Sequence, residues 1–158
     1  MFLFKASGRT YLRVVKRSLH AFPNRPQEVE VGQLVLLSKN REDCTPSEAQ
    51  IQNVAKILDV RPATAEELER QFPGVSAGER FEVIIELYWL EPLETPFNLS
   101  QAIGPEHKFY NTVQDFSKLR DPDELAVFGF LVKKNPRVVL SYLNRNDLPE
   151  KLADREFT

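Results

Sequence analysis

The strongest constraint on the fold of this 158-residue chain is an ordered series of short apolar segments separated by turn signals. Segments rich in Val, Ile, Leu and Phe that end at glycine, proline or polar clusters predict β-strands. The expected strands cover residues 1–5, 31–38, 51–60 and 80–90, and a short apolar piece closes the series at 96–99. The sequence therefore predicts a sheet or barrel built from short strands.

The apolar pattern within these segments indicates how the strands are covered. Residues 34–37 and 51–60 are apolar on both faces, which is typical of central strands. The segment 80–90 alternates, with one face formed by Phe81, Val83, Ile85, Leu87 and Trp89 and a mixed second face. An alternating strand of this kind indicates an antiparallel sheet. Together with helical segments elsewhere, the pattern predicts an α+β fold, and we expect Trp89 to fill the core or barrel.

A helix is expected from about Thr10 to Ala21, directly after the first strand. One stripe at helical spacing contains Leu12, Val15, Leu19 and Phe22, and we expect it to face the core. An adjacent stripe is basic and contains Arg9, Arg13, Lys16, Arg17 and His20. The pattern leaves two interpretations of this stripe open, a solvated helix face and a surface that binds anions.

The net charge of −2 conceals an uneven distribution of charged residues. Residues 1–25 contain six of the 21 basic side chains and no acidic one, so the other 133 residues carry 15 basic against 23 acidic side chains. Such asymmetry indicates that one face meets an anion while the rest of the surface maintains solubility.

The remaining helix signals lie between the strands and towards the C-terminus. Thr64-Ala-Glu-Glu67 is a capping box that opens a short helix with Leu68 and Phe72 as its buried pair. We expect Asp121-Pro-Asp-Glu124 to cap a helix through Leu131, and a last helix to begin at Asn135-Pro136. The prediction is a single domain over residues 1–144, followed by a peripheral tail or helix at 145–158.

Several functional classes lack support in the sequence. Cys44 is the single cysteine, and the two histidines, His20 and His107, have no spacing typical of a metal site or a catalytic triad. Glycine-rich phosphate loops and serine nucleophile motifs are missing, and no apolar run reaches the roughly 20 residues of a membrane span. We expect a cytoplasmic binding domain that is not an enzyme and needs no cofactor, metal or membrane.

Several short motifs that follow one another along the chain in a fixed order indicate a family. Phe2-Leu-Phe-Lys5-Ala-Ser7 is similar to the opening strand of YTH proteins, and Gln33-Leu-Val-Leu-Leu-Ser38 is similar to the EVE pattern Gly-Asp-Leu-Val-x-x-x-Ser. Residues 53–56, 78–87 and 93–99 resemble the later strands and the Pro-x-x-Leu turn, with Asn53 in place of a glycine. The chain thus resembles the PUA-like superfamily, close to its EVE and YTH branches, from about Met1 to Leu131. This resemblance implies a small, mostly antiparallel β-barrel surrounded by helices.

The resemblance also implies a site. The family's base pocket maps onto Lys5, Ala6, Ser7, Phe22, Ser38, Asn40 and Phe72, where the two phenylalanines replace the tryptophans usual in the family. The phosphate-binding role falls to Arg9, Arg13, Lys16 and Arg17 of the basic helix.

The implied function is recognition of a methylated or otherwise altered base that is flipped into the pocket. DNA is favoured over RNA as the target. The expected setting is the target-recognition module of a modification-dependent restriction system, with a nucleotide-hydrolysing motor or nuclease subunit as partner. The alternative is a regulatory protein-interaction or small-ligand module on the same barrel. Phosphate-based binding weakens steeply with salt and so distinguishes the two.

Overall fold

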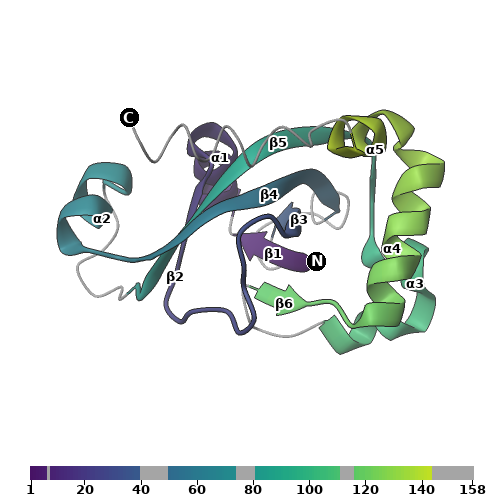
Figure 1. Ribbon diagram of the computed structural model, residues 1–158, viewed down its shortest axis with the longest axis horizontal. Helices are drawn as coiled ribbons and strands as arrows, with labels where there is room; N and C mark the ends of the chain where they lie inside the picture. Colours follow the sequence, from purple (N-terminus) through teal and green to yellow (C-terminus); the bar gives the residue numbers. More distant parts are fainter. Residues whose placement is uncertain (7, 40–49, 74–80, 111–115, 144–158) are drawn as a thin grey trace.

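The computed structural model describes residues 1–6, 8–39, 50–73, 81–110 and 116–143. Within these ranges, a curled six-stranded sheet is surrounded by helices (Figure 1). In chain order the elements are β1 (Phe2–Ala6), α1 (Gly8–Arg17), β2 (Leu19–Phe22), β3 (Leu34–Lys39), β4 (Ile51–Pro62), α2 (Ala65–Gln71), β5 (Val83–Phe97), α3 (Leu99–Ile103), the 3-10 helix η2 (Gly104–Tyr110), β6 (Phe116–Lys118), α4 (Asp121–Lys134) and α5 (Pro136–Leu143). The predicted α+β class is confirmed.

The strand order is β2-β5-β4-β3-β1-β6, and one pair of neighbours is parallel. That pair is β1 and β3, in which Lys5 lies opposite Ser38, while the other neighbouring strands are antiparallel. The two outermost strands approach each other, because the rings of Phe22 on β2 and Phe116 on β6 lie 5.5 Å apart between centroids. The sheet therefore curls into a half-barrel with these rings on its concave side.

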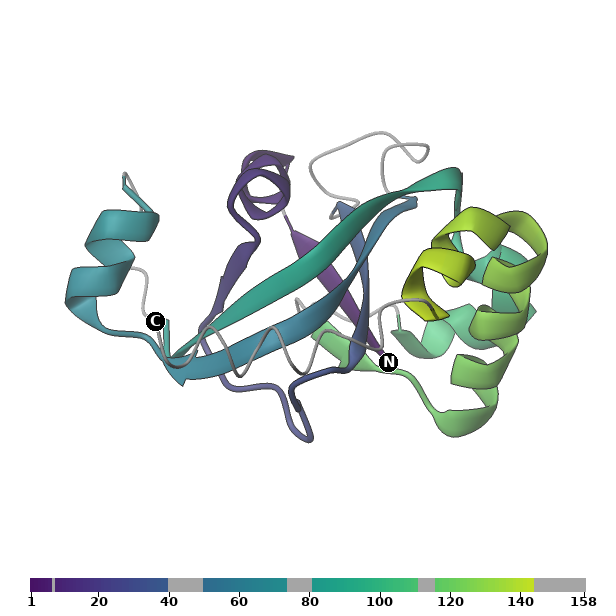
Figure 2. The same cartoon turned by 45° about the horizontal axis from the view of Figure 1, so that its top comes forward.

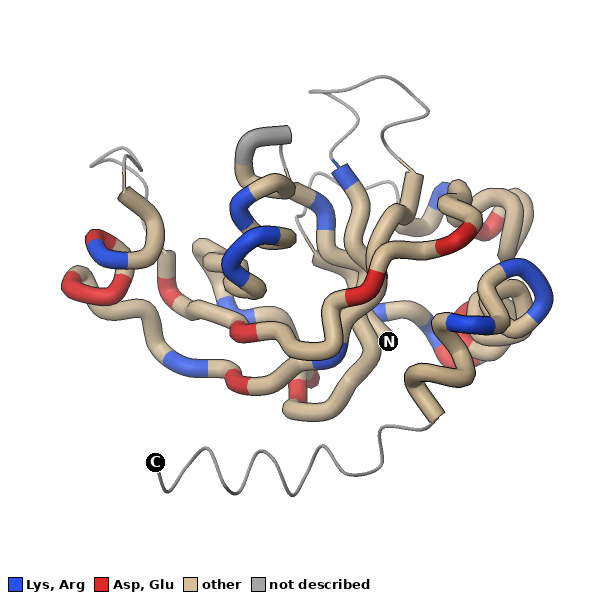
Figure 3. The backbone as a smooth tube through the Cα atoms, turned by 90° about the horizontal axis from the view of Figure 1, so that it is seen from above, with Lys and Arg blue, Asp and Glu red and all other residues tan. Residues whose placement is uncertain are grey.

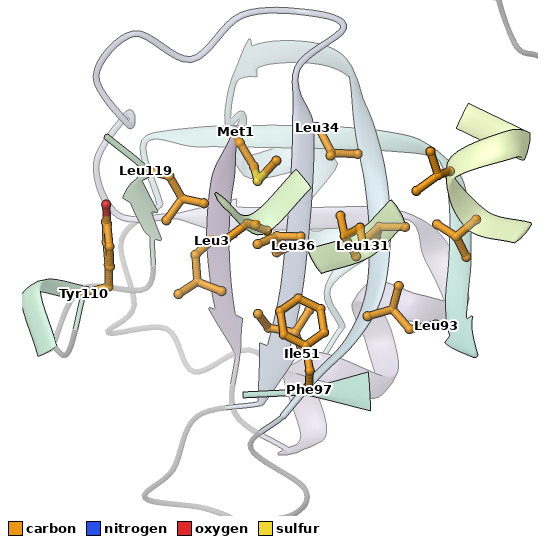
Figure 4. Packing of buried hydrophobic residues seen from close by; sticks show 14 of the residues in the cluster. Met1, Leu3, Leu34, Leu36, Ile51, Leu93, Phe97, Tyr110, Leu119 and Leu131 are labelled. Atoms are coloured by element: carbon orange, nitrogen blue, oxygen red, sulfur yellow. The ribbon is translucent and has the colours of Figure 1, made fainter. Parts of the chain in front are cut away.

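Strand alternation divides the hydrophobic residues between the two faces of the sheet. On the concave side, Phe2 and Phe4 of β1 pack with Val35 and Leu37 of β3, and Tyr11 and Val14 of α1 cover them. On the other side, the outward residues of the same strands pack against α4 and α5, as Figure 4 shows for Leu3, Leu36 and Leu131. Both faces of β3 and β4 are covered, which explains why their sequences are apolar throughout.

The predicted helix over residues 10–21 was too long, and its core stripe was wrong. α1 ends at Arg17, Ser18 adopts a positive φ of 57°, and the next residues form β2, with Leu19 opposite Glu86 of β5. Leu12 is 67% exposed, whereas Tyr11 and Val14 are buried. The helical period of the sequence gave a wrong prediction because residues 19–22 pair with β5 in the sheet. Hydrogen bonds and burial in the sheet outweigh a local sequence pattern.

The face expected for Trp89 was also wrong. β5 runs on through Phe97, and its register with β4 slips because Lys56 pairs with Tyr88 while Val54 pairs with Glu91. One extra residue in β5 makes a β-bulge there, and Trp89 has a φ of 49°. The side chain consequently packs on the α4–α5 side of the sheet, away from Val83, Ile85 and Leu87.

Two helix starts were located correctly, but their side chains act differently from the prediction. The Thr64 hydroxyl accepts a hydrogen bond from the Glu67 amide at 3.2 Å, as expected, yet the Glu67 carboxylate binds Arg61. α4 begins with Arg120 as its N-cap, and no side chain caps it. The carboxylate of Asp123 instead accepts hydrogen bonds from the Tyr110 hydroxyl and the Arg120 guanidinium. Cys44 and the predicted tail at 145–158 lie outside the described residues.

We predict that Trp89→Ala lowers the free energy of unfolding by about 3–5 kcal/mol, the usual cost of truncating a large buried aromatic residue. Trp89 is 7% exposed, its Nε1 donates to Ser141 Oγ at 2.8 Å, and its ring lies 5.6 Å from that of Tyr142. Ser141→Ala leaves the indole N–H unpaired and should cost about 1–3 kcal/mol. Urea unfolding measures both values, and an unchanged transition in Trp89→Ala would contradict this packing.

Candidate functional site

The parallel pair β1 and β3 brings part of the predicted pocket together at one end of the sheet. Lys5 and Ser38 are register partners, and Ala6 lies next to them opposite Lys39. Ala6 and Ser38 are buried, whereas Lys5 is half-buried and donates from Nζ to the carbonyl oxygen of Tyr110 at 2.6 Å. Ser7 and Asn40, the other polar residues predicted here, lie outside the described residues.

The two predicted aromatic walls do not face each other. Phe22 is fully buried on the concave side, where its ring centroid lies 4.9 Å from that of Phe4 and 5.5 Å from that of Phe116. Phe72 belongs to a separate cluster with Ala21 and Ile84, on the opposite side of the β2–β5 pair. Both phenylalanines thus pack as core residues, because neighbouring residues of β2 point to opposite faces of the sheet.

Polar residues that the sequence analysis missed lie on the concave face of the sheet, opposite to the face on which Lys5 and Ser38 lie. The Tyr11 hydroxyl donates to Oδ1 of Asn53, which is 8% exposed on β4, and Lys39 Nζ lies 5.8 Å from the centre of the Tyr11 ring. Burial raises the pKa of Tyr11, so its hydroxyl stays neutral and available as a hydrogen-bond donor. An asparagine within an apolar strand was the signal for Asn53, and the incorrect helix stripe hid Tyr11.

α1 is a basic surface next to this end of the sheet. The helix contains Arg9, Arg13, Lys16 and Arg17 and no acidic residue, and Figure 3 shows this cluster of basic positions. Lys16 and Arg17 are exposed, while Arg13 is half-buried; the side chain of Arg9 lies outside the described part. α1 packs against β1, β2 and β3 on the concave side, so its positive charge lies on the same side of the sheet as Tyr11 and Asn53, whereas Lys5 and Ser38 point to the opposite side.

Two of these basic side chains are held by the end of α2. The Arg13 guanidinium carbon lies 5.8 Å from the centre of the Phe72 ring, and Arg17 Nη1 donates to the carbonyl oxygen of Gln71. A cation on an aromatic face and a guanidinium at a helix C-terminus are both favourable arrangements. Phe72 therefore positions a phosphate-binding candidate, although it lies apart from the β1–β3 end of the sheet.

His20 does not belong to the basic surface, contrary to the sequence prediction. It lies on β2, 4% exposed, with its ring centroid 4.1 Å from that of Phe22 and 6.0 Å from that of Phe4. Burial lowers its pKa from 6.5 to about 4, so the ring is neutral at physiological pH. Its charge consequently contributes nothing to anion binding there.

Another part of the surface is concave and differs in charge from the basic surface on α1. It is a hollow of about 500 Å³ between the start of β3 and the α4–α5 pair, and its lining includes Gln33, Asp121, Glu124, Phe128 and Tyr142. Two carboxylates make this hollow a poor place for a phosphate. In the part of the chain that the structure describes, no group of three or more His, Cys, Asp or Glu residues could hold a metal ion, and no helix is long and apolar enough to cross a membrane.

The comparisons with known proteins find similarity of structure. No protein-family model matches the chain, and no curated protein does. The crystal structure of ASCH from Zymomonas mobilis matches with a TM-score of 0.59 and 12% identity over 81% of this chain and 93% of that one. A tyrosine-to-phenylalanine variant of the same protein gives a TM-score of 0.59, and a serine-to-alanine variant gives 0.58, each at 12% identity. The match with the tyrosine variant covers 81% of this chain and 96% of the variant. The match with the serine variant covers 82% of this chain and 94% of the variant.

At this level of identity the match establishes the fold. ASCH domains are PUA-like barrels, so the predicted PUA-like α+β architecture is confirmed. The match shows nothing finer than the fold, and the EVE or YTH branch stays a prediction from the sequence motifs.

We predict that burial of His20 makes the protein sensitive to acid. The unfolded chain binds a proton near pH 6.5 and the folded chain only near pH 4, so stability falls as the pH drops between these values, by about 1.4 kcal/mol per pH unit. Relative to a His20→Leu variant, the wild type should lose about 2 kcal/mol more of its free energy of unfolding between pH 7 and pH 5. Denaturant titrations at both pH values measure this difference, and equal losses would show that His20 is not buried as described.

Proposed function

We propose that this chain is a nucleic-acid-binding domain that recognises a methylated or otherwise altered base flipped into the polar end of its barrel. The observation that carries the proposal is the position of α1. A helix with four basic residues and no acidic one packs on the concave face at the end of β1 and β3, on the same side of the sheet as the buried pair of Tyr11 and Asn53. A flipped nucleotide has phosphates on either side of its base. In the proposed complex these phosphates contact the basic helix, and the edge of the base contacts the polar groups at the end of the sheet.

The phosphate contacts are assigned to Arg13, Lys16 and Arg17. Lys16 and Arg17 are exposed, and the contacts of Arg13 with Phe72 and of Arg17 with Gln71 restrain both guanidinium groups. Restrained groups lose less conformational entropy when they bind, so they suit a phosphate better than freely rotating chains. Such contacts add affinity without reading sequence or modification.

Base recognition is assigned to the groups at the end of β1 and β3. Ser38 and Asn53 are buried polar side chains on opposite faces of the sheet, with Asn53 on the same face as α1, and small polar groups of this kind read the edge of a base by hydrogen bonds. The backbone ends of two parallel strands add amide and carbonyl groups at the same place. With Phe22 and Phe72 packed in the core, Tyr11 supplies an aromatic side chain next to Asn53, to which its hydroxyl donates a hydrogen bond.

The biological setting follows from the resemblance of residues 2–7 and 33–38 to YTH and EVE proteins. It suggests a target-recognition module of a modification-dependent restriction system, with DNA favoured over RNA and a nucleotide-hydrolysing motor or nuclease as partner. The chain acts in this proposal as a reader and leaves chemistry to the partner. The acid-lined hollow at Asp121 and Glu124 supports the alternative, a protein-interaction or small-ligand module.

We predict that Arg13→Gln with Lys16→Gln weakens binding of modified and unmodified oligonucleotides alike. Each lost phosphate contact should lower the slope of log K against log salt by about 0.7–0.9. The matched control is Lys108→Gln with Lys134→Gln, which removes the same charge from exposed positions on η2 and α4. Fluorescence anisotropy over a salt series measures the effect. Binding that is weak for every oligonucleotide and insensitive to salt would reject the nucleic-acid proposal in favour of the alternative.

We predict that Ser38→Ala reduces the preference for the modified target. Loss of a hydrogen bond in a desolvated site costs about 1–3 kcal/mol, or roughly 5–150-fold in affinity. Affinity for the unmodified oligonucleotide should hardly change, because phosphates dominate it. Ser117→Ala, a half-buried serine on β6, serves as the control for removal of a hydroxyl. If the ratio of the two affinities stays the same in Ser38→Ala, the base is read elsewhere.

A further inference from the structure

α4 is apolar on both of its sides, although only one side meets the core. Val127 and Leu131 are buried against the sheet, while Leu125 is 75% exposed and Val132 is 48% exposed on the other side. A helix that is hydrophobic all round is normally buried. Here one half of the helix surface lies at an end of the molecule, remote from α1 and α2 (Figures 1 and 2).

The exposed residues of α4 form one continuous face. We call it the α4 outer face, and its members are Pro122, Leu125, Ala126, Gly129 and Val132. Their spacing of three and four residues places them along one side of the helix. Charged residues flank this face at its ends, with Asp121 in the first turn and Lys133 in the last. Leu140 and Leu143 of α5 add exposed apolar surface on the adjacent helix.

Gly129 is not required by the monomer. A Cβ atom at this position would meet nothing within 4 Å, and its φ is not in the positive region that favours glycine. Glycine in a helix interior is less stable than alanine. A glycine there becomes useful when another backbone or a large side chain must approach closely, which indicates that a partner covers this face.

We propose that the α4 outer face binds the same face of a second copy of this chain, with the two helices antiparallel about a two-fold axis. An axis passing midway between Leu125 and Gly129 places the large Leu125 of each copy over Gly129 of the other. The same axis places Asp121 of each copy beside Lys133 of the other, and Pro122 beside Val132. The face is thus complementary to itself in shape and in charge, as an isologous interface requires.

The charge pattern distinguishes this partner from nucleic acid. A phosphate backbone would meet the carboxylate of Asp121 at one end of the face and apolar side chains along its middle, and only Lys133 at the other end would attract it. A second copy offers the opposite charge at each end because the acidic and basic turns exchange places in the antiparallel arrangement. The inference does not depend on the proposed function, because α4 and α1 belong to different core clusters.

The first test introduces a side chain where the monomer has room for it. Gly129→Glu should fold with unchanged or raised thermal stability, since its Cβ enters open space and the helix gains a better helix former. Sedimentation velocity over a range from low to high micromolar protein should show wild-type dimers and Gly129→Glu monomers. A wild-type protein that stays monomeric throughout, or a Gly129→Glu variant that still forms dimers, would overturn the proposal.

The second test uses charge reversal to identify the antiparallel pairing. Asp121→Lys and Lys133→Glu should each be monomeric alone, because like charges then meet at both ends of the interface. An equimolar mixture should form a heterodimer, since each variant restores the other's pairs. Lys134→Glu is the matched control, because Lys134 is exposed on the same last turn but lies off the α4 outer face, and it should remain dimeric. A mixture that stays monomeric would overturn the antiparallel arrangement.

Discussion

The parallel pairing of β1 with β3 is the constraint on which the rest of the structure depends. It places a strand from the start of the chain between β3 and β6, so that residues separated by a hundred positions share one sheet. It also makes Lys5 and Ser38 neighbours, because parallel strands end at the same edge. A parallel pair needs a crossover connection, and α1 and β2 lie within it. The basic helix therefore arrives at the polar end of the sheet as a consequence of topology.

Different helices pack on the two faces of the sheet, and this arrangement separates the basic and acidic parts of the molecular surface. α1 covers the concave side through Tyr11 and Val14, whereas α4 and α5 cover the opposite side through Val127, Leu131 and Val138. The basic residues of α1 and the acidic first turn of α4 consequently lie on different parts of the surface (Figure 3). A net charge close to zero thus coexists with one surface suited to an anion and another that repels it.

Sequence reasoning reached the fold class and the central strands, because both depend on local apolar pattern, and it placed Lys5 and Ser38 at the ends of two strands that the structure pairs. It failed where tertiary pairing overrides a local period. Leu19 and Phe22 fit a helical stripe but belong to the strand β2. His20 lies on the same strand and is therefore buried in the core, although the sequence predicted it on the surface. A single bulge reversed the face of Trp89, and no pattern within one strand reveals an extra residue that only its neighbour defines.

The placement of the two proposed surfaces has a consequence for binding. α1 packs on one face of the sheet and the α4 outer face points away from the other, so self-association through α4 leaves Lys16 and Arg17 exposed. A two-fold dimer would carry two basic helices related by the same axis. Binding of one long nucleic acid by both copies would then raise the apparent affinity through effective concentration, without any additional contact within each site. A target too short to reach both copies would gain nothing from the dimer, because only simultaneous engagement of the two sites yields this advantage.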